Sequence, residues 1–108
     1  MSKSSKSKWP KNMFFEPAAI EDFSALDGTQ KIEVYKALIK VAKNPQPRPK
    51  GYGKPLGKDL ASYMKIKLRD SGIRIIYRLE PHESDNMNIY IIGMRSDSEV
   101  YNDILRRL

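Results

Sequence analysis

Two neighbouring segments with alternating side chains constrain the fold of this chain most strongly. Residues 63–69 read YMKIKLR and residues 73–79 read IRIIYRL, and the short segment Asp-Ser-Gly separates them at residues 70–72. Successive side chains of a β-strand point to opposite faces, and a short polar loop with glycine is a hairpin signal. The two segments therefore predict an antiparallel hairpin with one apolar face and one cationic face.

The register of this hairpin follows from keeping its apolar side chains together. Because side chains alternate with period two, a slip by one residue would mix the two faces. A loop of two or four residues keeps the faces separate and predicts three opposite pairs: Arg69 with Arg74, Lys67 with Ile76, and Lys65 with Arg78. The face that we expect to be buried contains Met64, Ile66, Leu68, Ile73, Ile75, Tyr77 and Leu79.

The opposite face of the hairpin concentrates positive charge. It is expected to gather Lys65, Lys67, Arg69, Arg74 and Arg78. Like charges on adjacent strands destabilise a sheet, and no acidic residue on these strands offsets them. An anionic ligand would offset the repulsion, and a phosphodiester backbone fits better than a membrane because no amphipathic apolar face accompanies the charge. A solvated outer sheet face is the simpler alternative.

A short strand and two helices are predicted before the hairpin. Residues 12–16 form a short apolar run that fits a strand. Pro17 suits the first turn of a helix, and Gly28 ends the apolar spacing that follows it. A second helix is predicted from about Thr29 to Lys43. Its apolar stripe is expected to contain Ile32, Tyr35, Leu38, Ile39 and Ala42.

The remaining segments complete an α+β pattern. Residues 44–57 contain four prolines and three glycines, which predict a long, extended, basic connection. Residues 88–94 indicate a third strand, and Ser98 to Leu108 a short C-terminal helix with Ser98 as its N-cap. The order β-α-α-β-β-β-α predicts a small, mostly antiparallel sheet with its helices packed on one face.

Length and composition favour one small domain with a polyanionic partner. The chain has 108 residues, with 20 Lys and Arg against 13 Asp and Glu, a formal net charge of +7. The absence of cysteine and the presence of one histidine, His82, argue against disulfides, metal ligation and imidazole catalysis, so neither metal nor cofactor is expected. No apolar run reaches the ~20 residues that span a bilayer. A cytoplasmic location without a membrane partner is therefore expected.

The first eleven residues differ in composition from the rest. Residues 1–11 are rich in serine and lysine and contain one large apolar residue, Trp9. One such side chain is too little to offset the entropy lost on ordering the segment. We therefore expect a disordered basic tail at residues 1–11 and a folded domain at residues 12–108.

Three motifs in the second half of the chain match a known family. They are residues 63–69, residues 72–77 and residues 93–101. In this order and spacing the chain resembles the RelE family of bacterial toxin–antitoxin ribonucleases, from about Phe14 to Leu108. The resemblance implies a RelE-like fold and a toxin that cleaves mRNA in the ribosomal A site and inhibits translation. It also implies three partners: messenger RNA, the ribosome with its rRNA, and a cognate antitoxin.

The resemblance further implies a metal-independent endoribonuclease with five catalytic positions. Lys67 would be the general base that removes the proton from a ribose 2′-OH, and Lys65 and Arg74 would stabilise charge on the attacked phosphate. Arg95 would assist the leaving 5′-oxygen, and Tyr101 would stack on or orient a base. The expected products are a 2′,3′-cyclic phosphate and a 5′-hydroxyl end.

Other cations near the hairpin are predicted to bind RNA: Lys54, Lys58, Arg69 and Arg78. Asp97 stands where the family often has a basic residue, which should weaken phosphate attraction locally. An acidic or amphipathic antitoxin segment is expected to cover the cationic side chains or to displace the last helix.

Two other functions fit the same residues. The related ParE branch shares the fold but inhibits DNA gyrase, and it does not need the paired Lys65 and Lys67 with Arg74 and Arg95. A non-catalytic RNA-binding domain would use the same cations, although aromatic residues for base stacking are sparse on that face.

Overall fold

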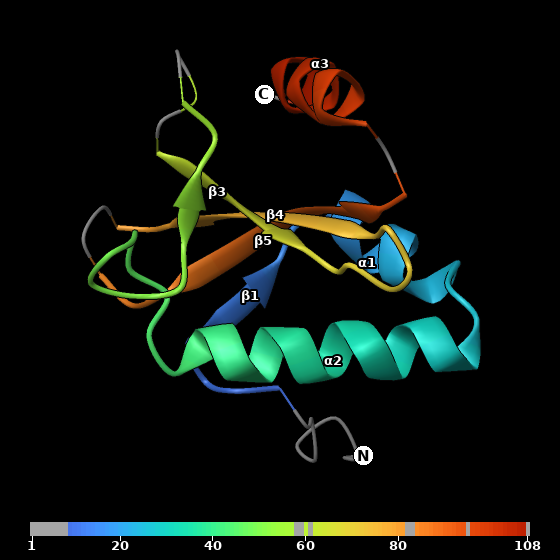
Figure 1. Cartoon of the computed structure of the whole chain (residues 1–108), viewed down its shortest axis with the longest axis horizontal. Helices are drawn as coiled ribbons and strands as arrows, with labels where there is room; N and C mark the ends of the chain where they lie inside the picture. Colours follow the sequence, from blue (N-terminus) through green and yellow to red (C-terminus); the bar gives the residue numbers. More distant parts are fainter. Residues whose placement is uncertain (1–8, 58–59, 61, 82–83, 95, 108) are drawn as a thin grey trace.

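A five-stranded sheet forms the centre of the molecule in a computed structural model that describes residues 9–57, 60, 62–81, 84–94 and 96–107 (Figure 1). The strands are β1 (Met13–Phe15), β2 (Lys54–Pro55), β3 (Tyr63–Lys67), β4 (Arg74–Leu79) and β5 (Met87–Gly93). Their order across the sheet is β1-β5-β4-β3-β2, and every neighbouring pair is antiparallel except β1 with β5. The predicted mostly antiparallel sheet is confirmed. The edge strand β2 was not predicted, because it lies within the proline-rich connection.

Three helices complete the predicted α+β order: α1 (Pro17–Ser24), α2 (Gly28–Ala42) and α3 (Asp97–Arg107). Pro17 occupies the start of α1, where its missing N–H costs no hydrogen bond. Asp27 caps α2, since its carboxylate accepts the N–H of Gln30 at 2.8 Å while the Gln30 side chain accepts the N–H of Asp27 at 3.1 Å. No helix in the described part of the chain is long and apolar enough to cross a membrane.

The N-cap of α3 is Ser96, and the prediction of Ser98 is wrong. The Ser96 hydroxyl accepts the N–H of Glu99 at 3.2 Å, and the Glu99 carboxylate accepts the N–H of Ser96 at 2.8 Å. Serine is present at both positions, but only Ser96 has a glutamate three residues later to complete a capping box.

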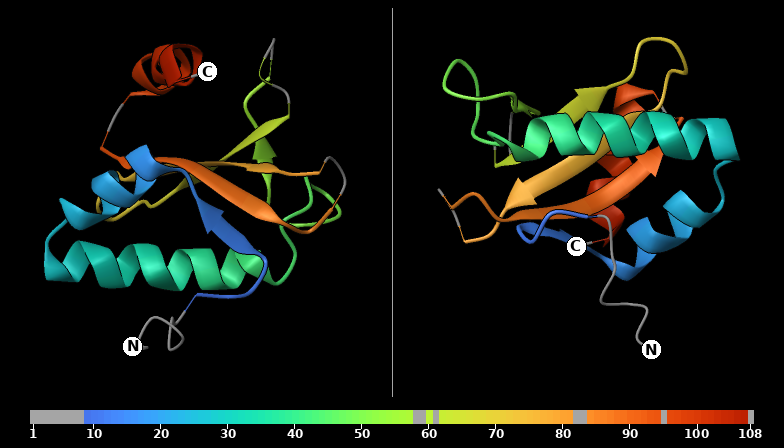
Figure 2. Two further views of the ribbon diagram at one scale, coloured as in Figure 1. Left: turned by 180° about the vertical axis from the view of Figure 1, so that it is seen from behind. Right: turned by 90° about the horizontal axis from the view of Figure 1, so that it is seen from below.

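Helices cover both faces of the sheet (Figures 1 and 2). α1 and α2 lie on one face, and α3 lies on the other. The main core, under α1 and α2, includes Val34, Leu38, Ile75, Tyr77 and Ile89. A second cluster contains Leu60, Tyr63, Ile76, Ile91, Val100 and Ile104. The expectation that all helices share one face is therefore wrong for α3, whose buried side chains pack on isoleucines of β4 and β5.

The hairpin keeps the predicted faces but not the predicted partners. The observed pairs are Tyr63 with Arg78, Met64 with Tyr77, Lys65 with Ile76, Ile66 with Ile75, and Lys67 with Arg74. The turn causes the difference: the Gly72 N–H donates to the Leu68 carbonyl at 2.8 Å, and Gly72 has φ +78°, which glycine adopts without strain. Arg69 thus lies in the turn rather than opposite Arg74. A shift by two residues preserves the faces because side chains alternate with period two.

The buried stripe of α2 differs from the predicted one. The buried residues are Val34, Leu38 and Val41, whereas Ile32 is 58% exposed. The helix has apolar side chains around more than one face, so spacing alone does not select which of them meets the sheet. Only Leu38 of the predicted stripe is fully buried.

The predicted tail is wrong for its last three residues. Trp9 is half-buried and packs in an aromatic cluster, with ring centroids 5.0 Å from Phe15, 5.5 Å from Phe23 and 5.1 Å from Tyr35. The Pro10 carbonyl also accepts the N–H of Met13 at 3.2 Å. The folded domain thus includes Trp9. Residues 1–8 of the expected tail and Leu108 of the expected last helix lie outside the described residues.

The proline-rich connection of residues 44–57 is fixed against the sheet. The Tyr77 hydroxyl, buried in the core, donates to the Pro45 carbonyl at 2.8 Å. Gly53 lies so close to this contact that a Cβ there would be 2.8 Å from the Tyr77 hydroxyl oxygen. The connection therefore has a defined place beside β3.

Candidate nucleic-acid interface

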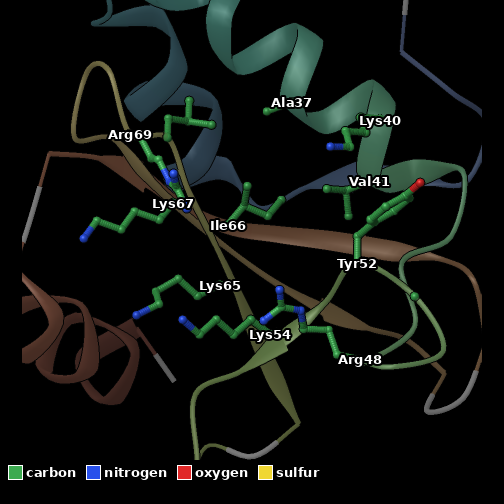
Figure 3. A pocket seen from close by; sticks show the side chains of 12 residues that line it. Ala37, Lys40, Val41, Arg48, Tyr52, Lys54, Lys65, Ile66, Lys67 and Arg69 are labelled. Carbon is green, nitrogen blue, oxygen red and sulfur yellow. The ribbon is translucent and has the colours of Figure 1, made fainter.

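Three strands bring four cations to one face of the sheet. Lys54 of β2 lies directly opposite Lys65 of β3, and Lys67 of β3 lies directly opposite Arg74 of β4. Opposite residues of antiparallel strands share a face, so Lys54, Lys65, Lys67 and Arg74 form one surface, called here the cationic face. Figure 3 shows Lys54, Lys65 and Lys67 extended to the same side of β3, away from Ile66. The structure thus brings together three of the predicted catalytic residues.

Two like-charge pairs stand at the centre of the cationic face. Directly opposite like charges destabilise a sheet, and the pairs Lys54–Lys65 and Lys67–Arg74 are both of this kind. Lys54 and Lys67 have no acidic partner within the described residues. Lys54 and Lys67 therefore each place positive charge directly opposite a second cation, as expected of a site for an anion.

The second apolar cluster adjoins the cationic face. Ile76 lies opposite Lys65 and is fully buried by α3, which explains why the alternating cations of β4 are interrupted there. Tyr101, on α3, is partly buried and packs against this same cluster. Tyr101 therefore lies on the same side of the sheet as the cationic face.

Of the remaining predicted site residues, one lies in the hairpin turn and others lie outside the described part of the chain. Arg69 is exposed in the hairpin turn, at one end of the β3 edge. Lys58, Arg95 and the side chain of Asp97 lie outside the part of the chain that the structure describes.

Arg78, which was predicted to bind RNA, belongs to a separate polar cluster. Its guanidinium lies 5.3 Å from the ring centroid of Tyr63 and 3.4 Å from the Tyr63 hydroxyl, and it lies 3.7 Å from the Glu80 carboxylate. The hydrogen bond to Tyr63 is the main cause that raises the pKa of Arg78, against a smaller opposing effect of burial. The sequence pattern placed Arg78 on the right face but could not show these partners.

Glu80 joins this polar cluster to β5. It accepts the Tyr90 hydroxyl at 2.5 Å and the Asn88 amide at 3.3 Å. Burial, followed by the hydrogen bond to Glu80, raises the pKa of Tyr90 above its usual range. In this cluster, polar side chains near the Leu79 end of β4 have hydrogen-bonding partners. The cationic face lies at the opposite end of β4, which begins at Arg74.

An ion pair that sequence patterns did not indicate holds the end of α3 in place. The Arg107 guanidinium lies 3.2 Å from Asp22 of α1 and donates to the Tyr90 carbonyl at 2.5 Å. Asp22 also accepts the Ile92 N–H at 3.1 Å. Because α3 carries Tyr101, these contacts fix the placement of that side chain over the sheet. The pair joins residues far apart in the chain, so no local spacing could reveal it.

No group of three or more metal-ligating side chains occurs among the residues that the structure describes. His82 lies outside them. The chemistry available on the cationic face is therefore that of amines, guanidiniums and, from α3, a phenol.

Comparisons with known proteins give one consistent set of relatives. The chain is 27% identical to the mRNA interferase toxin RelE of Escherichia coli strain K12 over 94 residues, which cover 87% of this chain and 93% of the relative. The mRNA interferase RelE of Shigella flexneri matches with the same identity and coverage. No protein-family model matches the chain.

Solved structures agree with these sequence matches. The crystal structure of the isolated E. coli RelE toxin superposes with a TM-score of 0.64 at 27% identity, covering 88% of this chain and 95% of the other. The toxin in the intact E. coli RelBE toxin–antitoxin complex superposes with a TM-score of 0.60 at 25% identity, covering 78% and 95%.

Proposed function

We propose that this chain is a member of the RelE family of mRNA interferase toxins, to which it is similar over most of its length, and that it is an endoribonuclease that cleaves messenger RNA in the ribosomal A site. The observation that carries the proposal is the cationic face, with two like-charge pairs directly opposite each other on neighbouring strands. Phosphodiester backbones are the anions that such a surface suits best, because each nucleotide supplies one negative charge.

Lys67 is proposed as the general base of the reaction. Its amine takes the proton of a ribose 2′-OH, and the 2′-oxygen then attacks the adjacent phosphorus. The bond from phosphorus to the 5′-oxygen breaks and the departing oxygen takes a proton from water, so the products are a 2′,3′-cyclic phosphate and a 5′-hydroxyl end. Lys67 is exposed and stands opposite Arg74, so a phosphate can approach both at once. No metal or cofactor takes part in the proposed reaction.

The other members of the cationic face stabilise charge. Lys65 and Arg74 flank Lys67 on β3 and β4 and would bind the oxygens of the pentacoordinate phosphorus, where negative charge increases in the transition state. Arg95 is proposed to stabilise the leaving 5′-oxygen, because arginine keeps its proton at neutral pH. Tyr101 is proposed to position the base. Lys54, Lys58 and Arg69 are proposed to bind neighbouring phosphates.

The proposed macromolecular partners are the ribosome and an antitoxin. The relative in the RelBE complex is bound to its antitoxin, and we propose an equivalent partner here, acting on a toxin in the cytoplasm. An acidic antitoxin segment over the cationic face would offset its like-charge repulsion and block the RNA.

Ribosomes that carry a defined message test the proposed reaction. Purified protein is added, and the 5′ ends of the RNA are mapped. The expected result is cuts within the A-site codon, which disappear in Lys67→Ala and Arg95→Ala but persist in Lys36→Ala, an exposed lysine of α2 away from the cationic face. A message with 2′-deoxyribose at the cut position is expected to stay intact, because it lacks the attacking oxygen.

Other outcomes would support other functions. Intact message together with inhibited DNA supercoiling by gyrase would contradict the nuclease and favour the ParE-like alternative. Binding of RNA without any cleavage would favour a non-catalytic RNA-binding domain.

A further inference from the structure

An open groove runs along the outer edge of β3 and continues from the cationic face (Figure 3). Its volume is about 650 Å³. α2 contributes one wall through Ala37, Lys40 and Val41, while the proline-rich connection contributes Arg48 and Tyr52. Within the described residues, β3 has a strand partner on this side only at Met64–Lys65, so the edge beyond Lys65 is open.

The charged side chains that line the groove are all cations. They are Lys40, Arg48, Lys54, Lys65, Lys67 and Arg69. Lys54, Lys65 and Lys67 also belong to the cationic face. A single-stranded RNA whose phosphate lies at these lysines can therefore continue directly into the groove. No acidic residue of the described chain lines it. Lys40 and Arg48, which pattern reasoning did not select, extend the positive surface from the sheet to α2.

Internal hydrogen bonds hold the loop that carries Arg48 and Tyr52 in one shape. The Arg48 N–H donates to the Gly53 carbonyl at 2.8 Å, and the Tyr52 N–H donates to the Asn44 carbonyl at 3.0 Å. A Cβ at Gly51 would lie 2.6 Å from the Asn44 carbonyl oxygen, so only glycine fits there. The loop is therefore a formed wall of the groove before any ligand binds.

Tyr52 supplies an aromatic surface in the groove. Its side chain is 49% exposed, and the Lys40 ammonium lies 5.4 Å from the ring centroid. This cation–π contact joins α2 to the connection and orients the ring. An exposed aromatic ring beside cations is the combination that binds single-stranded nucleic acid, because bases stack on the ring while cations contact phosphates.

The exposed side chains of the groove favour RNA over a peptide. An amphipathic peptide would need large exposed apolar residues to dock against. The large exposed apolar residues of the described chain are Phe14, Ile20, Ile32, Tyr52, Met94 and Leu105, and of these only Tyr52 lines the groove. The remaining apolar lining is small or mostly buried, so charge and one aromatic ring dominate recognition.

We propose that this groove binds the single-stranded RNA segment next to the cleaved bond, with Lys40 and Arg48 on phosphates and Tyr52 stacked on a base. The inference rests on the proposed nuclease function, because it places the adjoining RNA beside Lys67. The three residues bind substrate and do not take part in the chemical step.

Binding to a fluorescent single-stranded RNA oligonucleotide with 2′-deoxyribose throughout its centre tests the groove without cleavage. The full chain and its variants are titrated by anisotropy over a range of KCl concentrations. Lys40→Ala and Arg48→Ala are each expected to reduce the salt slope of log K by about 0.7, the loss of one phosphate contact. Tyr52→Ala is expected to weaken binding roughly tenfold, and Tyr52→Phe to retain it.

Matched controls lie on the same elements outside the groove. Lys36→Ala on α2 and Lys50→Ala in the connection are expected to leave the salt slope unchanged. Groove variants whose RNA affinity and salt slope equal those of the controls would overturn the inference. Groove variants that weaken binding of poly-L-glutamate but not of RNA would also overturn it, because the groove would then recognise an acidic peptide.

The same variants separate this inference from the nuclease proposal. Suppose that the wild-type protein cleaves ribosome-bound message and that the groove variants equal the controls in RNA affinity and in KM. This result would refute the RNA-binding role of the groove and would still support the proposed nuclease. Groove-dependent RNA binding without any cleavage would refute the nuclease and support the groove as an RNA site.

Discussion

Replacing Lys67 by glutamine should stabilise the fold while removing the proposed activity. Lys67 lies directly opposite Arg74 and has no acidic partner among the described residues. A directly opposite pair of side chains changes the stability of a sheet by roughly 0.2–1 kcal/mol relative to a pair of alanines, and a like-charge pair is destabilising. Lys67→Gln should therefore raise the free energy of unfolding by about 0.5 kcal/mol. For a domain of this size that corresponds to a rise in Tm of about 3 °C.

Arg78→Gln provides a matched control on the same face of the same sheet. The substitution Arg78→Gln removes a cation–π contact to Tyr63 at 5.3 Å and an ion pair to Glu80 at 3.7 Å, and both contacts are partly solvated. Together these contacts contribute about 1 kcal/mol, so this variant should be destabilised by that amount. The two substitutions each remove one cation, yet their effects on stability should have opposite signs.

Urea unfolding at low and high salt measures both effects. The gain from Lys67→Gln should shrink near 1 M salt, where charges are screened beyond about 3 Å. Message cleavage is measured on the same preparations. If Lys67→Gln destabilised the protein as much as Arg78→Gln does, Lys67 would serve the fold, and the interpretation of the cationic face as a site held at a cost in stability would be refuted.

Three further predictions concern the surrounding structure. Gly53→Ala should lower the free energy of unfolding by about 2 kcal/mol in urea unfolding, because the new methyl group would lie 2.8 Å from the Tyr77 hydroxyl oxygen; an unchanged midpoint would show that the connection yields freely. Trp9→Ala should cost about 2 kcal/mol through loss of its three aromatic contacts, whereas Trp9→Phe should cost less; equal stability of Trp9→Ala and wild type would mean that the N-terminal segment contributes nothing to the domain. Burial raises the pKa of Tyr77 and of Tyr90, so both should stay protonated in the folded protein when exposed tyrosines ionise near pH ~10. The stability that they contribute is present below that pH and is lost as pH rises further, and spectrophotometric titration in which every tyrosine ionises together below the unfolding transition would contradict this.

The hairpin shows which structural features the sequence determines locally. The alternation of residues 63–69 and 73–79 predicted both faces correctly, because strand geometry alone sets which side chains share a face. The pairing partners depend on the turn, where Gly72 adopts a positive φ and shifts the register by two residues. Turn conformation is a choice among several that the same short loop permits, so the partners could not be predicted from the pattern.

Helix placement required tertiary information. The apolar residues of α2 allow more than one buried stripe, and contact with the sheet selects Val34, Leu38 and Val41. The position of α3 likewise depends on the sheet, where the interrupted alternation at Ile76 was the one local sign of a second apolar contact. An isoleucine between two arginines on one strand face indicates that another element packs on this face, although the arginines alone would predict that it is exposed to solvent.

The candidate site divides in the same way. Lys65, Lys67 and Arg74 were predicted to share a face, and the structure places them together with Lys54. Lys40, Arg48 and Tyr52 were not predicted as site residues, because a helix and an irregular connection come together there only in three dimensions. Residue patterns therefore indicated the sheet surface, and folding adds the groove beside it.

The single-turnover rate of cleavage of ribosome-bound message tests the central claim most directly. With enzyme in excess, Lys67→Ala should lower this rate by at least about 100-fold, the usual contribution of a general base, while Lys36→Ala should cut at the wild-type rate. If Lys67→Ala cleaved the message as fast as wild type, the cationic face would not be the catalytic centre.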